Sequence, residues 1–175
     1  KAATEGCLGT FNESLRLNRN WNDKRAYHCF QEATKKEKAE QFSVCATDAR
    51  RSLEKENRLD TRTVLARCLE RANSWGEATN EWSQLGSLAI NKRRFSVARR
   101  AKARAAQLRR RMPILILQQP PNVKDLIIKL DGAKLPLELL DQEMPVDPGE
   151  HKVEAQGERD GLPLTFEQAI TLRPG

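Results

Sequence analysis

The chain has 175 residues, a formal net charge of +7, a charged fraction of 31% and a hydrophobic fraction of 38%. No run of about 18 apolar residues occurs, which excludes a transmembrane span in this sequence, and the regular apolar positions exclude an intrinsically disordered chain. Because the sequence begins at Lys1 rather than Met, we expect any leader or membrane anchor to lie outside it.

Charge and proline content divide the chain at one place. Residues 1–112 carry 25 basic and 13 acidic side chains, whereas residues 113–175 carry 6 and 11. All eight prolines lie at or after Pro113. Since proline disrupts helix interiors, the first part can be helical throughout and the second cannot. We therefore predict an α+β protein with a helical domain at 1–112 and a β domain at 113–175.

The first domain contains six predicted helices, separated by polar or glycine-containing turns. Asn22 or Asp23 can cap the second helix, and Asp60 can cap the fourth. Apolar residues recur at helical spacing inside these segments, which predicts antiparallel helical hairpins. The predicted helices cover residues 3–17, about 23–35, 38–55, 61–73, 77–90 and 92–112.

The four cysteines follow a duplicated pattern. Cys7 and Cys29 are 22 positions apart, Cys45 and Cys68 are 23 apart, and the second pair trails the first by 38 to 39 positions. Each pair is centred on a predicted turn, so its members should lie level on neighbouring antiparallel helices. We therefore predict the disulfides Cys7–Cys29 and Cys45–Cys68, each worth about 3 kcal/mol. This pairing implies an oxidising compartment.

Other interpretations of the cysteines and acidic residues stay open. The cysteines could be reduced, buried thiols, whereas a zinc site is disfavoured because no Cys-x-x-Cys pair occurs. An acidic cluster could bind calcium loosely, but its prolines and the lack of EF-hand spacing favour a solvated turn. We predict no metal and no cofactor. The cluster comprises Asp141, Glu143, Asp147 and Glu150.

The segment 92–111 contains ten basic residues and no acidic one. Its field could bind phospholipid, lipopolysaccharide, nucleic acid or an acidic protein, or it could be a solvated face that complements the helix dipole. Nucleic acid is disfavoured because the chain has no aromatic stacking platform and no known reading motif. The anion-binding candidates are Lys92, Arg93, Arg94, Arg99, Arg100, Lys102, Arg104, Arg109, Arg110 and Arg111.

The second domain shows the alternating pattern of strands. Turn signals at 131–132, 147–149 and 157–161 separate the apolar runs. Short strands joined by Pro/Gly turns predict a small antiparallel β-sandwich or sheet. The predicted strands lie within 114–117, 126–130, 151–155 and 164–172.

Two motifs of this domain carry a family resemblance. The strand and turn ending in Asp131-Gly132, and the run from Pro148 through Glu150 and His151 to Val153, resemble the PEGA-type β domains of bacterial cell-envelope proteins. The helical domain is similar to the tetratricopeptide-like arrays that precede such domains. The resemblance implies a periplasmic or otherwise extracytoplasmic scaffold, often tethered to a membrane by an anchor outside this segment. It implies no catalytic residues.

We weigh three functions for this chain. The first is a non-enzymatic scaffold or adaptor whose helical repeats bind a protein or peptide. The second is binding of an anionic polymer or membrane surface through residues 92–111, which should weaken steeply as salt rises. The third is an enzyme, which we do not expect, because the sequence has two distant histidines, no phosphate loop and no metal-ligand spacing.

Overall fold

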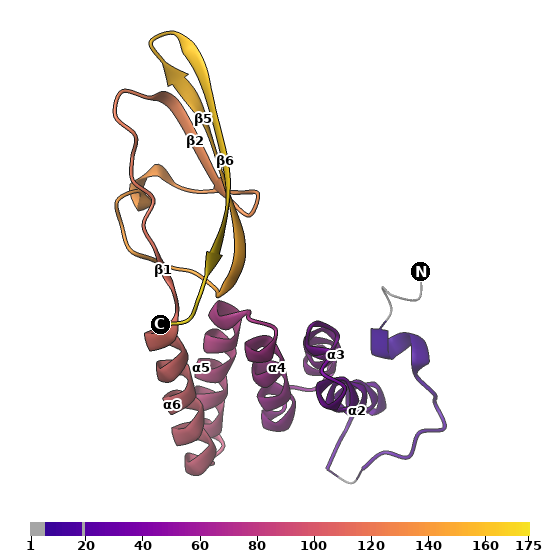
Figure 1. Cartoon of the computed structure of the whole chain (residues 1–175). Coiled ribbons are helices and arrows are strands. Elements are labelled where there is room, and N and C mark those ends of the chain that lie inside the picture. Colours follow the sequence, from indigo (N-terminus) through magenta and orange to yellow (C-terminus); the bar gives the residue numbers. More distant parts are fainter. Residues whose placement is uncertain (1–5, 19) are drawn as a thin grey trace. The chain divides into compact units, whose positions relative to one another are not determined.

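A computed structural model describes residues 6–18 and 20–175 of the chain. It is an α+β structure in which helices precede antiparallel sheets (Figure 1). The chain forms two compact units, one up to Arg109 and one from Arg110 onward. The sequence places this division three residues later, at 112/113. We call the two parts the helical unit and the β unit and describe each by itself.

The helical unit is built from one short 3-10 helix and a series of α-helices. Buried alanines line the helix contacts, and Trp75, Trp82 and Leu85 form a core stripe along α5, with at most 9% of each residue exposed. Within the described residues the elements are η1 (Gly6–Thr10), α2 (Lys24–Lys38), α3 (Phe42–Lys55), α4 (Leu59–Arg71), α5 (Trp75–Asn91) and α6 (Phe95–Arg111).

The first predicted helix, at 3–17, is wrong. Its first residues lie outside the described part, η1 follows, and the described residues of 11–23 contain no helix. A side chain that bonds to nearby backbone competes with helical hydrogen bonding. Here Asn12 Oδ1 accepts both the backbone N–H and the hydroxyl of Ser14, at 2.9 and 2.8 Å. This local turn replaces a helical one.

Three helix connections share one kind of turn. The connections α2–α3, α4–α5 and α5–α6 each contain three residues, and the central one has a positive φ: Glu40 at 58°, Asn73 at 62° and Arg93 at 54°. In each turn the following N–H bonds to the carbonyl five residues earlier, which closes the helix end. Glu40 and Asn73 are 33 positions apart, so the hairpins α2–α3 and α4–α5 repeat with that period. The cysteine period of 38 to 39 is therefore not the structural repeat.

The β unit contains two antiparallel sheets. The larger has four strands in the order β3-β2-β5-β6, and the smaller pairs β1 with β4. A short 3-10 helix, η2 (Leu137–Leu139), lies between β3 and β4. The strands are β1 (Ile114–Leu115), β2 (Lys124–Leu130), β3 (Ala133–Lys134), β4 (Met144–Pro145), β5 (Gly149–Arg159) and β6 (Leu162–Leu172).

Two hairpins of this sheet close through two-residue turns. The predicted Asp131-Gly132 turn is confirmed between β2 and β3, with φ values of 52° and 80°. Asp160-Gly161 closes β5 and β6 with φ values of 54° and 79°, the pair of positive angles that such tight hairpins need. The predicted turn at 157–161 is thus too long, because Gly157 lies inside β5 and the turn itself needs only two residues.

The larger sheet has one apolar and one polar face. Ile128, Leu140 and Val153 form the buried core of the β unit. Directly opposed residues of antiparallel strands point to the same face, and Ala155 opposes both Ile128 and Phe166. Most apolar side chains of β2, β5 and β6 therefore share one face, whereas Ile127 opposes Gln156 on the other. The other face carries the charged residues of these strands.

Candidate interaction surfaces

The cysteines form two disulfides, Cys7–Cys29 and Cys45–Cys68, with Cα separations of 5.1 and 6.0 Å. This is the pairing predicted from the spacing, and no cysteine is free. Cys45 and Cys68 join α3 to α4 across the short turn between them, as the register argument requires. Cys7 instead reaches Cys29 on α2 from the 3-10 helix η1.

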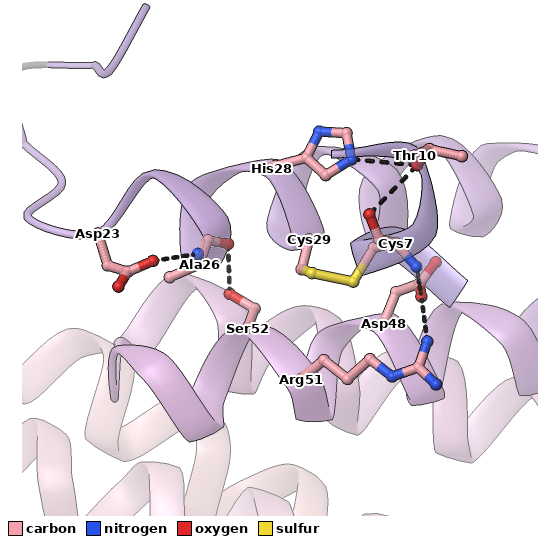
Figure 2. The surroundings of a disulfide bond; sticks show 9 residues. All are labelled: Cys7, Thr10, Asp23, Ala26, His28, Cys29, Asp48, Arg51 and Ser52. Atoms are coloured by element: carbon pink, nitrogen blue, oxygen red, sulfur yellow. Dashed lines mark hydrogen bonds and ion pairs between the residues drawn. A yellow bond between two sulfur atoms is a disulfide. The ribbon is translucent and has the colours of Figure 1, made fainter. Parts of the chain in front are cut away.

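A buried carboxylate reinforces the first disulfide (Figure 2). Asp48 of α3 is 2% exposed, and its Oδ1 accepts the N–H of Cys7 at 2.9 Å. The same oxygen lies 3.7 Å from the guanidinium of Arg51. Asp48 therefore holds η1 against α3 while the disulfide holds it against α2. Sequence reasoning missed Asp48, whose only local signal is an acidic and a basic residue three positions apart.

The helical unit carries a groove of about 530 Å³. A groove of this volume is too small for a folded partner but can hold a side chain or a short peptide segment. We call it the helix groove. It is lined by residues from α2 and α3 at their connection and from α4, α5 and α6. Its lining residues are the acidic Glu37, Glu40 and Glu70, the basic Lys38, Arg67, Arg71, Arg100 and Arg104, and the aromatic Phe42 and Trp82.

Two ion pairs cross the helix groove between alternate helices. Arg67 of α4 binds Glu37 of α2 through two hydrogen bonds of 2.6 and 2.8 Å. Arg104 of α6 binds Glu70 of α4 in the same two-pronged way, with one bond of 2.9 Å. The hydrogen bonds that both arginines donate to these glutamates raise the pKa of each arginine, although burial opposes the charge. Glu37 and Glu70 are 33 positions apart, the period of the helix turns.

Subtracting these pairs leaves a surplus of positive charge in the groove. Lys38, Arg71 and Arg100 stay, against the single carboxylate of Glu40. The Arg71 guanidinium lies 5.0 Å from the ring centre of Phe42, a cation–π contact that orients it beside an apolar surface. In the described part of the chain, Arg100 makes no ion pair. The groove thus combines cations with aromatic side chains.

The predicted basic segment is divided by the structure. Lys92, Arg93 and Arg94 lie in the α5–α6 turn rather than in the helix. On α6, Arg104 is held by Glu70, and Arg109 donates to Ser83 Oγ at 3.2 Å. The other basic residues are exposed and lie on α6 outside its buried alanine stripe. They are Arg99, Arg100, Lys102, Arg110 and Arg111.

The β unit carries an apolar groove of about 840 Å³, which we call the sheet groove. Its floor is the apolar face of the larger sheet, and one wall is the segment from Leu115 to Val123. Phe166 of β6 lines it and is 52% exposed. Sequence alternation predicts this apolar face but not that part of it stays open.

Residues 6–18 and 20–175 hold no group of three or more histidine, cysteine or acidic side chains placed to bind a metal ion. No helix within these residues combines the length and the apolar character needed to cross a membrane. The chain matches no protein-family model, no curated protein and no solved structure. Function is therefore inferred from the geometry of the two grooves and the charges around them.

His151 lies between two acceptors at the base of the β unit. Its Nδ1 is 2.7 Å from Asp131 Oδ2 and its Nε2 is 2.7 Å from the carbonyl oxygen of Asp147. Both contacts are hydrogen bonds only when both ring nitrogens carry protons. Burial opposes this charge, but the bonds to Asp131 and Asp147 outweigh it and raise the pKa of His151 above its usual 6.5. The bond from His151 lowers the pKa of Asp131.

The β unit should therefore lose stability as pH rises above 6.5 and through the raised pKa of His151. A histidine whose pKa is raised by folding contributes fully below pH 6.5, and the contribution disappears as pH rises through the folded value. Amide exchange of β2 and β5 should be faster, after correction for intrinsic rates, at pH 8 than at pH 6. His151→Gln should remove this dependence. An NMR titration that placed the pKa of His151 at or below 6.5 would contradict the assignment.

Proposed function

We propose that this chain is a non-enzymatic scaffold or adaptor that binds a protein or peptide partner in the helix groove. The observation that carries the proposal is the groove's surplus of cations beside Phe42 and Trp82. Such a surface favours a peptide segment with acidic and apolar side chains. The two ion pairs support the proposal, because they fix the spacing of α2, α4 and α6 around the groove.

We propose further that the helical unit is tetratricopeptide-like and the β unit a PEGA-like sandwich. The 33-residue period of the turns supports the first assignment. The tight Asp131-Gly132 turn, tied to β5 through His151, supports the second. The two disulfides are compatible with an oxidising environment. We therefore propose that the protein functions in the periplasm or another extracytoplasmic space of a bacterial envelope.

A second candidate function is attachment to an anionic envelope surface. Arg99, Lys102 and Arg110 of α6 are exposed and do not line the helix groove. The turn residues Lys92 to Arg94 add to this positive surface. Phospholipid or another polyanion would bind here by charge alone, which makes the attachment strongly dependent on salt. Nucleic acid is the least favoured polyanion, because the chain has no known reading motif and the exposed Phe95 is not by itself a stacking platform.

Matched arginine variants separate the two candidates. The probe is a fluorescein-labelled peptide of alternating glutamate and leucine, titrated by fluorescence anisotropy at low and moderate ionic strength. Arg71→Ser and Arg100→Ser should each weaken binding about fivefold, since each removes a charged contact worth about 1 kcal/mol at a half-exposed site. Arg99→Ser and Arg110→Ser carry the same charge change outside the groove. They should leave peptide binding almost unchanged.

The control arm uses vesicles that contain phosphatidylglycerol. If all four variants weaken peptide and vesicle binding equally, the total positive charge rather than the groove explains the affinity, and the groove proposal is wrong. If peptide binding disappears at moderate salt for the unchanged protein, the second candidate is favoured. A triple variant of Arg99, Arg100 and Arg104 would not separate peptide binding in the groove from attachment to an anionic surface. Arg100 and Arg104 line the groove, whereas Arg99 lies outside it.

A further inference from the structure

Within residues 6–18 and 20–175, no strand pairs with the outer edge of β6. β6 is the last strand of the larger sheet and runs for 11 residues. Leu162 opposes Arg159 across the two-residue turn, so it belongs to a pair that exchanges hydrogen bonds within the hairpin. Alternation along the strand then directs the N–H and C=O groups of Thr165, Glu167, Ala169 and Thr171 away from β5. Pro163, which has no N–H, takes an outward position too, as edge prolines do.

Apolar side chains lie beside this edge. The residues that bond inward, Leu162, Leu164 and Phe166, also project onto the apolar face, and Leu164 and Phe166 line the sheet groove. Their exposed fractions are 68%, 39% and 52%. A strand added to β6 would place every second side chain over this apolar surface. The edge therefore supplies main-chain hydrogen bonds, and the groove supplies pockets for alternate side chains.

The polar face beside the same edge is negatively charged. Glu167 has a side chain that is 65% exposed, and it shares the ammonium of Lys152 with Glu154, at 3.0 and 3.1 Å. Lys129 of β2 opposes Glu154 two strands from the edge, whereas β6 itself carries Glu167 and no lysine or arginine. Glu158 and Asp160 lie at the tip of the hairpin, and residues 113–175 carry five more acidic than basic side chains. A strand bound at this edge would need basic residues on its polar face.

We propose that β6 binds an extended peptide with alternating apolar and basic side chains, which joins the sheet as a fifth strand. The occupant is not a second copy of β6, because residues 162–172 contain Glu167 and no lysine or arginine. This surface lies within the β unit and is independent of the helix groove. A chain that failed to bind acidic peptides in the helix groove could still bind this strand.

The test uses the full chain and an acetylated peptide of alternating lysine and valine. In ¹H–¹⁵N NMR spectra, the amides of Thr165, Glu167, Ala169 and Thr171 should shift and become protected from exchange. Ala169→Pro removes one outward N–H without removing a bond to β5, and should weaken binding about fivefold. Ala169→Thr keeps that N–H and serves as its matched control. Phe166→Ser should weaken binding at least about tenfold by removing apolar contact.

A charge reversal keeps the test decisive if Ala169→Pro disturbs the hairpin. Glu167→Lys should weaken the lysine–valine peptide and strengthen a glutamate–valine peptide of the same pattern. The proposal is overturned if neither peptide binds at about 1 mM, or if Glu167→Lys changes neither affinity. It is also overturned if sedimentation shows that the unchanged chain forms dimers that Phe166→Ser dissociates, because the occupant would then be a second copy.

Discussion

Replacing both Cys45 and Cys68 by alanine is expected to lower the free energy of unfolding of the helical unit by about 3 kcal/mol. The bond closes a loop with a sequence separation of 23 and joins α3 to α4 at the middle of the unit. Without it the unfolded chain gains conformational entropy, while the folded helices stay in place. Urea unfolding followed by tryptophan fluorescence measures this loss, since Trp21, Trp75 and Trp82 all lie in the helical unit.

The matched control is the pair Cys7→Ala with Cys29→Ala. This loop has almost the same length, with a separation of 22, so the entropy gained by the unfolded chain is similar. The short η1, however, can leave α2 without unfolding the remaining helices, and the folded state then gains entropy too. The control variant should therefore lose less free energy of unfolding than the variant that lacks Cys45 and Cys68. Equal losses for both pairs would contradict the assignment of η1 as a peripheral element.

Asp48→Ala is expected to destabilise the helical unit by about 3 kcal/mol, the lower end of the cost of removing one partner of a buried ion pair. Asp48 is 2% exposed, and its removal leaves the N–H of Cys7 and the mostly buried guanidinium of Arg51 without this acceptor. The lower end applies because the Arg51 side chain keeps 19% of its surface exposed. Urea unfolding with the same fluorescence signal measures the effect.

Asp48→Asn separates hydrogen bonding from charge at this position. The amide oxygen can still accept the N–H of Cys7, but the negative charge beside Arg51 is lost. The asparagine variant should thus be more stable than the alanine variant and less stable than the unchanged chain. If Asp48→Ala left the free energy of unfolding within about 0.5 kcal/mol of its original value, as ordinary surface changes do, Asp48 would not tie η1 to α3.

The spacing of cysteines and apolar residues along the chain predicts most of the helices and both disulfides of this fold. The positions of Cys45 and Cys68 about the α3–α4 turn are enough to predict their bond. The prediction of the Cys7–Cys29 bond is correct although residues 6–17 form only the 3-10 helix η1 and not the predicted α-helix, because Cys7 on η1 still lies beside Cys29 on α2. Five of the predicted helices appear with ends shifted by a few residues, since their apolar periods are strong.

The helix groove could not be predicted from the sequence. Its ion pairs join residues 30 and 34 positions apart, and no local pattern links Glu37 to Arg67 or Glu70 to Arg104. The positive φ of Glu40 and Arg93 was also hidden, because such residues seldom adopt it and glycine or asparagine is the usual signal. The sheet groove depends on how little of the apolar face the short β1–β4 pair and its neighbours cover, which strand patterns do not reveal.

The most direct test of the account is the thiol state of the protein as it is isolated. Free thiols are blocked with N-ethylmaleimide at cell lysis, the protein is digested without reduction, and linked peptides are identified by mass spectrometry. The account predicts fragments that join Cys7 to Cys29 and Cys45 to Cys68, with no cysteine alkylated. Four alkylated cysteines, or any other pairing, would contradict both the packing of the helical unit and its assignment to an oxidising compartment.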